Sequence, residues 1–145
     1  MPFPIIDTFK KSSFVRANFY GWLVFSVVAT IDVHYANNRE TPLIDGFFFF
    51  GVILTQAFYW GYFICYPLVE KKRFLLLVPA VLISFTIHCA LDYFNDFILL
   101  PAVKPDVEKL TFDLKEFIML HLWFFPEYTL IGIGFRHGRE LFVKQ

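Results

Sequence analysis

Residues 74–100 read FLLLVPAVLISFTIHCALDYFNDFILL, and the length and apolar character of this segment decide the fold class. A helix needs about 20 mainly apolar residues to cross the roughly 30 Å hydrocarbon core of a bilayer. Backbone groups inside lipid must be paired, which restricts a spanning segment to a helix or to a strand of a closed barrel. The segment lacks the alternation of barrel strands, so it predicts a membrane-spanning helix.

Three other segments share this character, at about residues 14–36, 43–68 and 115–140. Hydrophobic residues make up 57% of the 145 residues and charged residues only 18%, whereas soluble domains average about 25% charged residues. The connectors between the segments are short and polar, which places successive helices as antiparallel neighbours. We therefore predict a single all-α domain over residues 1–145, an integral membrane up-down four-helix bundle.

The basic residues indicate how such a bundle is oriented. If the N-terminus is cytoplasmic, nine of the 13 basic residues lie on the cytoplasmic side: Lys10, Lys11, Arg16, Lys71, Lys72, Arg73, Arg136, Arg139 and Lys144. The remaining four lie on the other side: Arg39, Lys104, Lys109 and Lys115. An excess of Lys and Arg marks cytoplasmic loops, so both ends of the chain are predicted to be cytoplasmic.

Polar residues near the middle of the spans form a first candidate cluster. Gln56, His88 and Glu127 fall near the midplane when about 1.5 Å per residue is counted along each segment. An unpaired carboxylate is expensive at that depth. We therefore predict that Glu127 is buried among the helices, protonated or in contact with His88 or Gln56. The alternative is a structural polar clamp with no other role.

A second candidate set lies toward the outer leaflet and consists of Asp32, His34, Asp92 and His121. These residues are predicted to line a water-filled cavity that holds a small ligand, senses protons through the histidines, or binds a divalent metal. The alternative is that they are interface-level residues that reach water. Because Asp92 and His121 have matched depths on two helices joined by one loop, we expect them to approach within hydrogen-bonding or water-bridged distance.

No cofactor is expected, although the sequence leaves alternatives open. His88 and His121 have loosely compatible depths for haem ligation, and the outer set leaves the metal unknown, because no HExxH motif or cysteine pair is present. Motifs of soluble catalysis and of nucleic-acid binding are also absent. We expect the partners to be the lipid bilayer and a protein or a second copy. Protein contacts would form through helix packing and the C-terminal tail, residues 139–145.

Residues 58–76 read FYWGYFICYPLVEKKRFLL, an aromatic helix end with Tyr66 before Pro67, then the basic hinge Lys71, Lys72, Arg73 and a new apolar helix. This pattern resembles the four-helix membrane domain of autolysin-regulator-class bacterial sensor histidine kinases. The resemblance implies a sensory input domain in the bacterial cytoplasmic (inner) membrane. In that family a coiled coil, a phospho-acceptor histidine and an ATP-binding domain follow, and none is present here. The resemblance therefore implies a detached or truncated input domain, and His137 takes no catalytic role.

Three functions remain open at this point. The first is a non-catalytic sensory input domain for signal transduction. The second is a small accessory or scaffold subunit of a larger membrane complex, which would act by helix packing. The third is a small membrane enzyme or cofactor protein that uses the outer His/Asp cluster.

Overall fold

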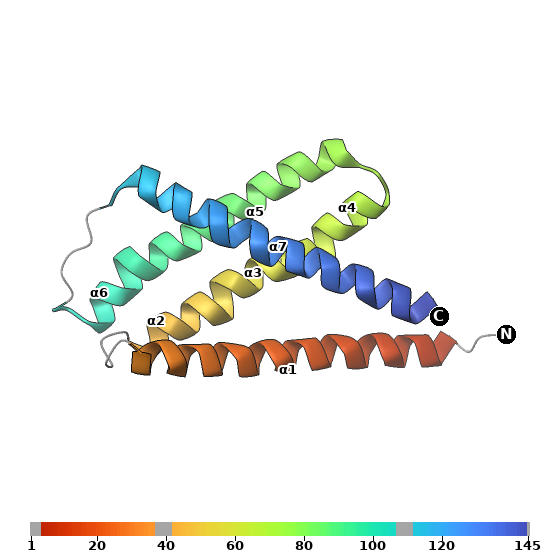
Figure 1. Cartoon of the computed structure of the whole chain (residues 1–145), viewed down its shortest axis with the longest axis horizontal. Coiled ribbons are helices and arrows are strands. Elements are labelled where there is room, and N and C mark those ends of the chain that lie inside the picture. Colours follow the sequence, from red (N-terminus) through yellow and green to blue (C-terminus); the bar gives the residue numbers. More distant parts are fainter. Residues whose placement is uncertain (1–3, 37–41, 107–111, 145) are drawn as a thin grey trace. The chain divides into compact units, whose positions relative to one another are not determined.

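The computed structural model describes residues 4–36, 42–106 and 112–144, with side chains from residue 16 onward (Figure 1). All secondary-structure elements of the described residues are helices, and these residues contain no strand. The elements, in chain order, are α1 Pro4–Ala36, α2 Leu43–Phe48, η1 Phe49–Ile53, α3 Leu54–Trp60, η2 Gly61–Cys65, α4 Tyr66–Glu70, α5 Phe74–Phe94, η3 Asn95–Leu99, α6 Leu100–Val103 and α7 Leu114–Lys144. The η segments are π-helical turns that continue the helices on either side of them.

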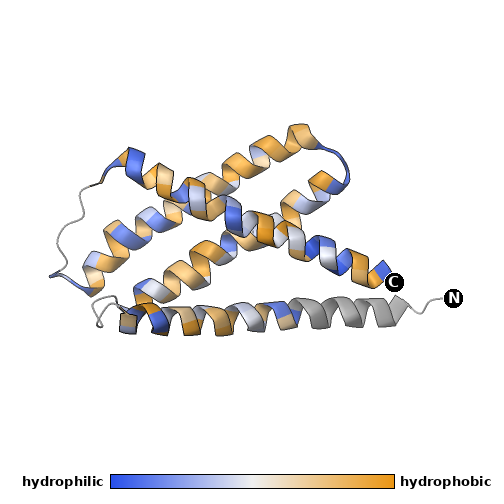
Figure 2. Cartoon of the chain, in the orientation of Figure 1, coloured by the Kyte–Doolittle hydropathy of each residue, from blue (hydrophilic) through white to orange (hydrophobic). Residues whose placement is uncertain are grey.

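Within the described ranges, four continuous helices are long and apolar enough to cross a membrane: Arg16–Ala36, Leu43–Glu70, Phe74–Val103 and Leu114–Lys144. They agree with the predicted spans, which confirms the helical assignment and the number of apolar helices. The last helix extends further at both ends than predicted. Figure 2 shows that apolar residues predominate along the described helices, with polar residues in the turn between α4 and α5 and at intervals along α7.

Contacts divide the chain into two compact units, Met1–Gly51 and Val52–Gln145. In the first unit α1 packs against α2, where a Cβ added at Gly46 would lie 3.1 Å from Cγ2 of Thr30. The hydroxyls of Ser26 and Thr30 donate to the carbonyls of Trp22 and Ser26 at 2.7 and 2.6 Å. These hydroxyls therefore satisfy their own helix, as serine and threonine often do, and need no ligand to explain them.

In the second unit the helix through α3, η2 and α4 has a buried stripe that repeats every four residues. Its members are Ile53, Leu54, Ala57, Phe58, Gly61, Tyr62, Cys65 and Tyr66. An α-helix has 3.6 residues per turn, so a four-residue repeat would drift by about 40° per step. A π turn holds more residues per turn, so the η2 segment keeps this stripe on one face.

The helix α7 crosses this stripe at very close range, and Figure 1 shows it lying across α3 and α5. A Cβ added at Gly61 would overlap the carbonyl oxygen of Thr129, and one added at Gly132 would overlap the carbonyl oxygen of Phe58. Only glycine permits this approach of two backbones, which is the usual role of small residues between membrane helices. We call this contact the glycine crossing.

The turn between α4 and α5 is the basic hinge Lys71, Lys72, Arg73. The Arg73 amide donates to the carbonyl of Leu68 at 2.8 Å, and the Lys72 amide donates to that of Val69 at 3.0 Å. Lys72 adopts a φ of 54°, the left-handed conformation that closes many helix ends. The turn and the C-terminal end of α7 lie at the same end of this unit, since Lys144 Nζ lies 4.0 Å from Glu70 Oε1.

Candidate functional site

The strongest candidate site is a buried acid–imidazole pair between α5 and α7. His121 Nε2 lies 2.9 Å from Asp92 Oδ2, and the two side chains are 0% and 5% exposed. The separation is that of an ion pair, although the ring N–H is not directed as in a well-formed hydrogen bond. The predicted approach of these two residues is confirmed.

His88 extends the pair into a three-residue group, which we call the His/Asp cluster: His88, Asp92 and His121. The His88 ring is fully buried and packs edge-on against His121, with ring centroids 5.1 Å apart. His88 and Asp92 are four residues apart on α5, so they share one face of that helix. The same spacing on α7 places Phe125 beside His121, and Phe125 packs 5.4 Å from the His88 ring.

Few polar atoms of the His/Asp cluster have a well-directed hydrogen-bond partner among the described residues. Among the described residues neither ring nitrogen of His88 makes a well-directed hydrogen bond, although the carbonyl of Ile53 lies close enough to interact with a proton on that ring. Buried polar groups are normally paired, so an imidazole in this state marks a place where a proton or a ligand changes the local energy.

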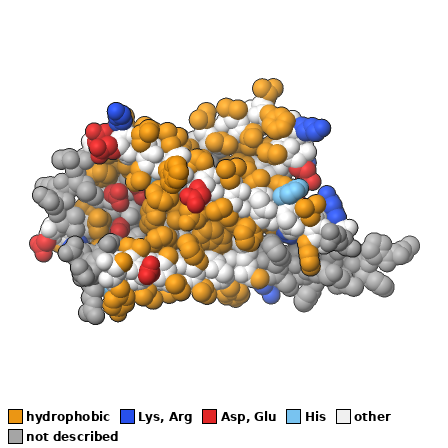
Figure 3. All heavy atoms as spheres, viewed as in Figure 1, with side chains coloured by type: hydrophobic (Ala, Val, Ile, Leu, Met, Phe, Trp, Pro, Cys, Tyr) orange, Lys and Arg blue, Asp and Glu red, His pale blue; other side chains and the backbone are white. Residues whose placement is uncertain are grey.

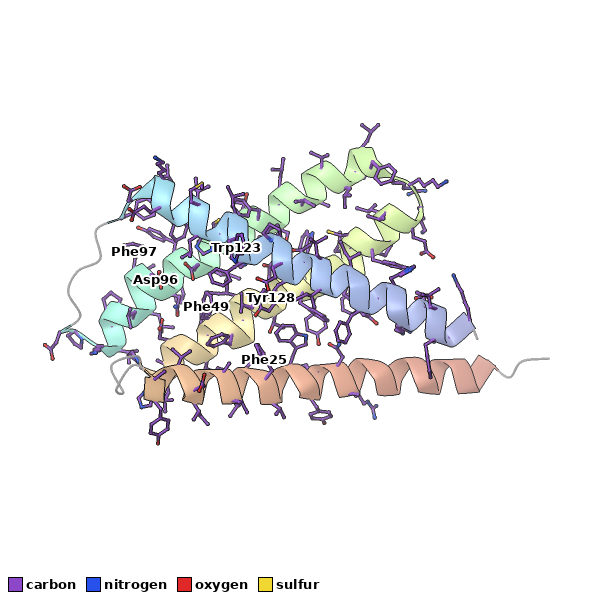
Figure 4. The ribbon with its side chains drawn as sticks, in the orientation of Figure 1. Phe25, Phe49, Asp96, Phe97, Trp123 and Tyr128 are labelled. Carbon is purple, nitrogen blue, oxygen red and sulfur yellow. The ribbon has the colours of Figure 1, made fainter. Side chains whose placement is uncertain are left out.

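Aromatic rings cover the cluster on the side of the α5–α7 connection. The Phe117 ring lies 4.4 Å from the His121 ring and 5.5 Å from Phe112, and Phe112 lies 5.5 and 5.6 Å from Phe97 and Tyr93. These rings pack against one another. Of these rings Phe117 contacts His121 directly, which is consistent with the complete burial of His121. Figure 4 labels Phe97 and Asp96, which lie on η3, the segment that continues α5.

A second polar contact lies one turn before His88. Gln56 Nε2 donates to Ser84 Oγ at 2.9 Å, and Ser84 is fully buried. Gln56 and His88, two members of the predicted midplane cluster, thus lie on facing helices. Their contacts are with Ser84, His121 and Phe125.

The prediction that Glu127, the third member of that cluster, is buried among the helices is wrong, because its side chain is exposed. The buried face of α7 carries Phe125 and Thr129, and at 100° per residue Glu127 points about 200° away from Phe125. Depth along the helix was estimated from the sequence, but the helical face decides burial. Glu127 therefore does not contact His88 or Gln56.

Asp32 and His34 belong to the first unit, whereas Asp92 and His121 belong to the second. Asp32 is exposed, and His34 is half-buried with its ring 5.6 Å from that of Tyr35. A cavity shared by all four residues stays a prediction.

Near the C-terminal end of α7 lies a polar contact that was not predicted from the sequence. Arg139 is 8% exposed, and its guanidinium donates to the hydroxyl of Tyr62 at 3.0 Å. The guanidinium of Arg136 lies 5.2 Å from the Tyr62 ring centroid and also forms an ion pair with Glu140 at 2.9 Å. The spacing in the sequence could have indicated this burial, because Arg139 lies seven residues after Gly132 and therefore on nearly the same face of the helix.

The alternatives that involve a metal or haem gain no support from this geometry. Among the side chains that the structure describes, no group of three or more His, Cys, Asp or Glu residues is arranged to hold a metal ion. His88 and His121 contact each other directly, so a porphyrin between them would have to separate α5 from α7. The arrangement places one carboxyl group and two imidazoles, groups that can exchange protons, in the contact between α5 and α7.

No family model, curated protein or solved structure matches this chain.

Proposed function

We propose that this chain is a non-catalytic membrane input domain, in which the buried His/Asp cluster controls the state of the last helix. The observation that carries the proposal is that His121, half of the buried pair with Asp92, lies on the same continuous helix as the C-terminal tail. An event at the cluster therefore acts on an element that leads directly out of the membrane.

The proposed architecture is a four-pass bundle in the bacterial inner membrane with both ends in the cytoplasm. The four apolar helices support the number of passes. The contact between Glu70 and Lys144 supports a common basic end, because it brings the hinge and the tail together. Lys and Arg near the ends of spans favour the cytoplasmic side.

The cluster is suited to switching because neither member of the pair is stable alone in a buried site. Removing one partner of a buried ion pair leaves an uncompensated charge and costs about 3–5 kcal/mol. A change of protonation, or a ligand that competes for Asp92 or His121, would therefore alter the packing of α5 against α7. The free energy involved, about 3–5 kcal/mol, is comparable to the free-energy difference between two conformational states of a protein.

The tail is the proposed output. The helix α7 runs from Leu114 to Lys144 without a break, in spite of Pro126. Beyond the contacts of Arg139 it exposes Leu141, Phe142 and Val143, which are 53%, 82% and 51% exposed. We propose that a partner chain or a second copy docks on these residues, as a kinase module would in the family that the hinge pattern resembles.

The test compares a cluster variant with a matched variant of the lipid-facing side. A nitroxide label is placed at Phe142→Cys in a chain freed of Cys65 and Cys89, and the protein is reconstituted in nanodiscs. His121→Phe should change the mobility of the label, because it removes the buried pair. Trp123→Phe, two residues away and 74% exposed, should leave it unchanged.

An unaltered label spectrum in a folded His121→Phe protein would overturn the input-domain proposal. Circular dichroism establishes whether the variant is folded. In that case stable, stoichiometric co-purification with another membrane protein would favour the accessory-subunit alternative.

A further inference from the structure

The α4–α5 turn presents three adjacent cations, Lys71, Lys72 and Arg73, and all three residues are exposed. Within the described part of the chain none of their side chains forms an ion pair or a hydrogen bond. Three neighbouring positive charges without intramolecular counter-charges repel one another, so an external anion is favoured beside them.

Two acidic residues at this end of the second unit already face basic residues of α7. Glu140 pairs with Arg136 at 2.9 Å, and Glu70 lies 4.0 Å from Lys144. Figure 3 shows basic side chains at the end of the second unit where this turn lies.

The backbone of the turn is well fixed by its own hydrogen bonds. The amides of Lys71, Lys72 and Arg73 all donate to carbonyls of α4, at 3.1, 3.0 and 2.8 Å. The three cations therefore project from a fixed backbone.

The position of the turn follows from the helices that it joins. One candidate span ends at Glu70 and the next begins at Phe74, so only three residues connect them. Three residues reach about 10 Å at full extension. If both helices cross a bilayer, the three cations stay at the level of the phosphate groups.

We propose that the α4–α5 turn is a docking surface for anionic phospholipid headgroups. The charge complementarity is direct, with three unpaired cations held at the level where lipid phosphates lie. A basic residue near an anionic bilayer surface contributes about a fivefold gain in affinity. This surface acts independently of the His/Asp cluster, so it goes beyond the proposed input function.

The test measures lipid selectivity of the full chain. The protein is reconstituted with equal amounts of phosphatidylglycerol and phosphatidylcholine of the same acyl composition and then extracted in mild detergent. The lipids that remain bound are quantified by mass spectrometry. We expect an enrichment of phosphatidylglycerol of at least about fivefold, which falls by at least about fivefold in Lys71→Gln/Lys72→Gln, where only Arg73 remains.

The matched control is Lys104→Gln/Lys115→Gln, which removes the same charge at the opposite end of the second unit. It should retain the enrichment. Equal losses in the two double variants, with unchanged thermal unfolding, would overturn the proposal because net charge would then explain the effect. Absence of enrichment in the unmodified chain would overturn it as well. So would displacement by inorganic phosphate that exceeds displacement by chloride at equal ionic strength, which would indicate a site for a free anion.

Discussion

Gly132→Ala gives the sharpest test of the packing in the second unit. A Cβ at this position would overlap the carbonyl oxygen of Phe58 and lie 2.9 Å from its carbonyl carbon and 3.1 Å from the amide nitrogen of Tyr62. Ordinary van der Waals contacts of a Cβ are 3.4–4 Å. All three atoms belong to the backbone and cannot rotate away, so the two helices have to separate by about 1 Å.

The cost follows from that separation. A gap of about 1 Å removes about half of the dispersion energy between the affected atoms, and overpacking costs about 1–3 kcal/mol in total. Alanine also gains about 1 kcal/mol over glycine in helix propensity. We therefore expect Gly132→Ala to lower the free energy of unfolding by up to about 2 kcal/mol. Gly134→Ala, on the same helix with open space around the new Cβ, should raise it by up to about 1 kcal/mol.

The assay is unfolding of the full chain from mild detergent by titration with sodium dodecyl sulfate, followed by far-ultraviolet circular dichroism. The two alanine variants should shift the midpoint in opposite directions. Equal shifts, or a Gly132→Ala protein more stable than the unmodified chain, would refute the close crossing as described.

Three further predictions use the same unfolding titration. Lys72→Gly should raise the free energy of unfolding by about 0.5–1 kcal/mol, because glycine adopts the φ of 54° without steric cost; a loss would contradict a left-handed turn residue. Asp113→Ala should lower it by about 1 kcal/mol, because Asp113 Oδ1 accepts two amide hydrogen bonds at the start of α7, at 2.8 and 3.1 Å, and Asp113→Asn should lose less. Tyr62→Phe should cost about 1–2 kcal/mol, because it removes the hydroxyl that accepts from the buried guanidinium of Arg139, and an unchanged midpoint would show that this bond is not formed in detergent.

The sequence was sufficient for the four helices because length and hydropathy determine whether a segment can cross a bilayer. It was also sufficient for the contact of Asp92 with His121, since two helices joined by one loop bring matched depths together. Each of these inferences depends on position along a helix axis.

Inferences that depend on rotation about the helix axis were less successful. Glu127 has the predicted depth but lies on the exposed face of α7, and the burial of Arg139 was not anticipated. The π-helical turns add to this difficulty because they shift the face on which later residues lie, and no residue type marks them in the sequence. The contact of His88 with His121 likewise depends on which sides of α5 and α7 face each other, and this cannot be read from depth alone.

The π-helical turns also have a consequence for how the chain tolerates changes in length. A π turn closes on the fifth residue where an α turn closes on the fourth, so it contains one residue more. Loss of one residue such as Phe63, an exposed member of η2, would convert the segment to an α-helix and leave the flanking residues on their present faces. The same loss within α5 would rotate every later residue of that helix by about 100° and remove Asp92 from His121. We therefore expect homologous chains to gain or lose single residues at η1, η2 and η3 and to conserve their length between Phe74 and Asp92.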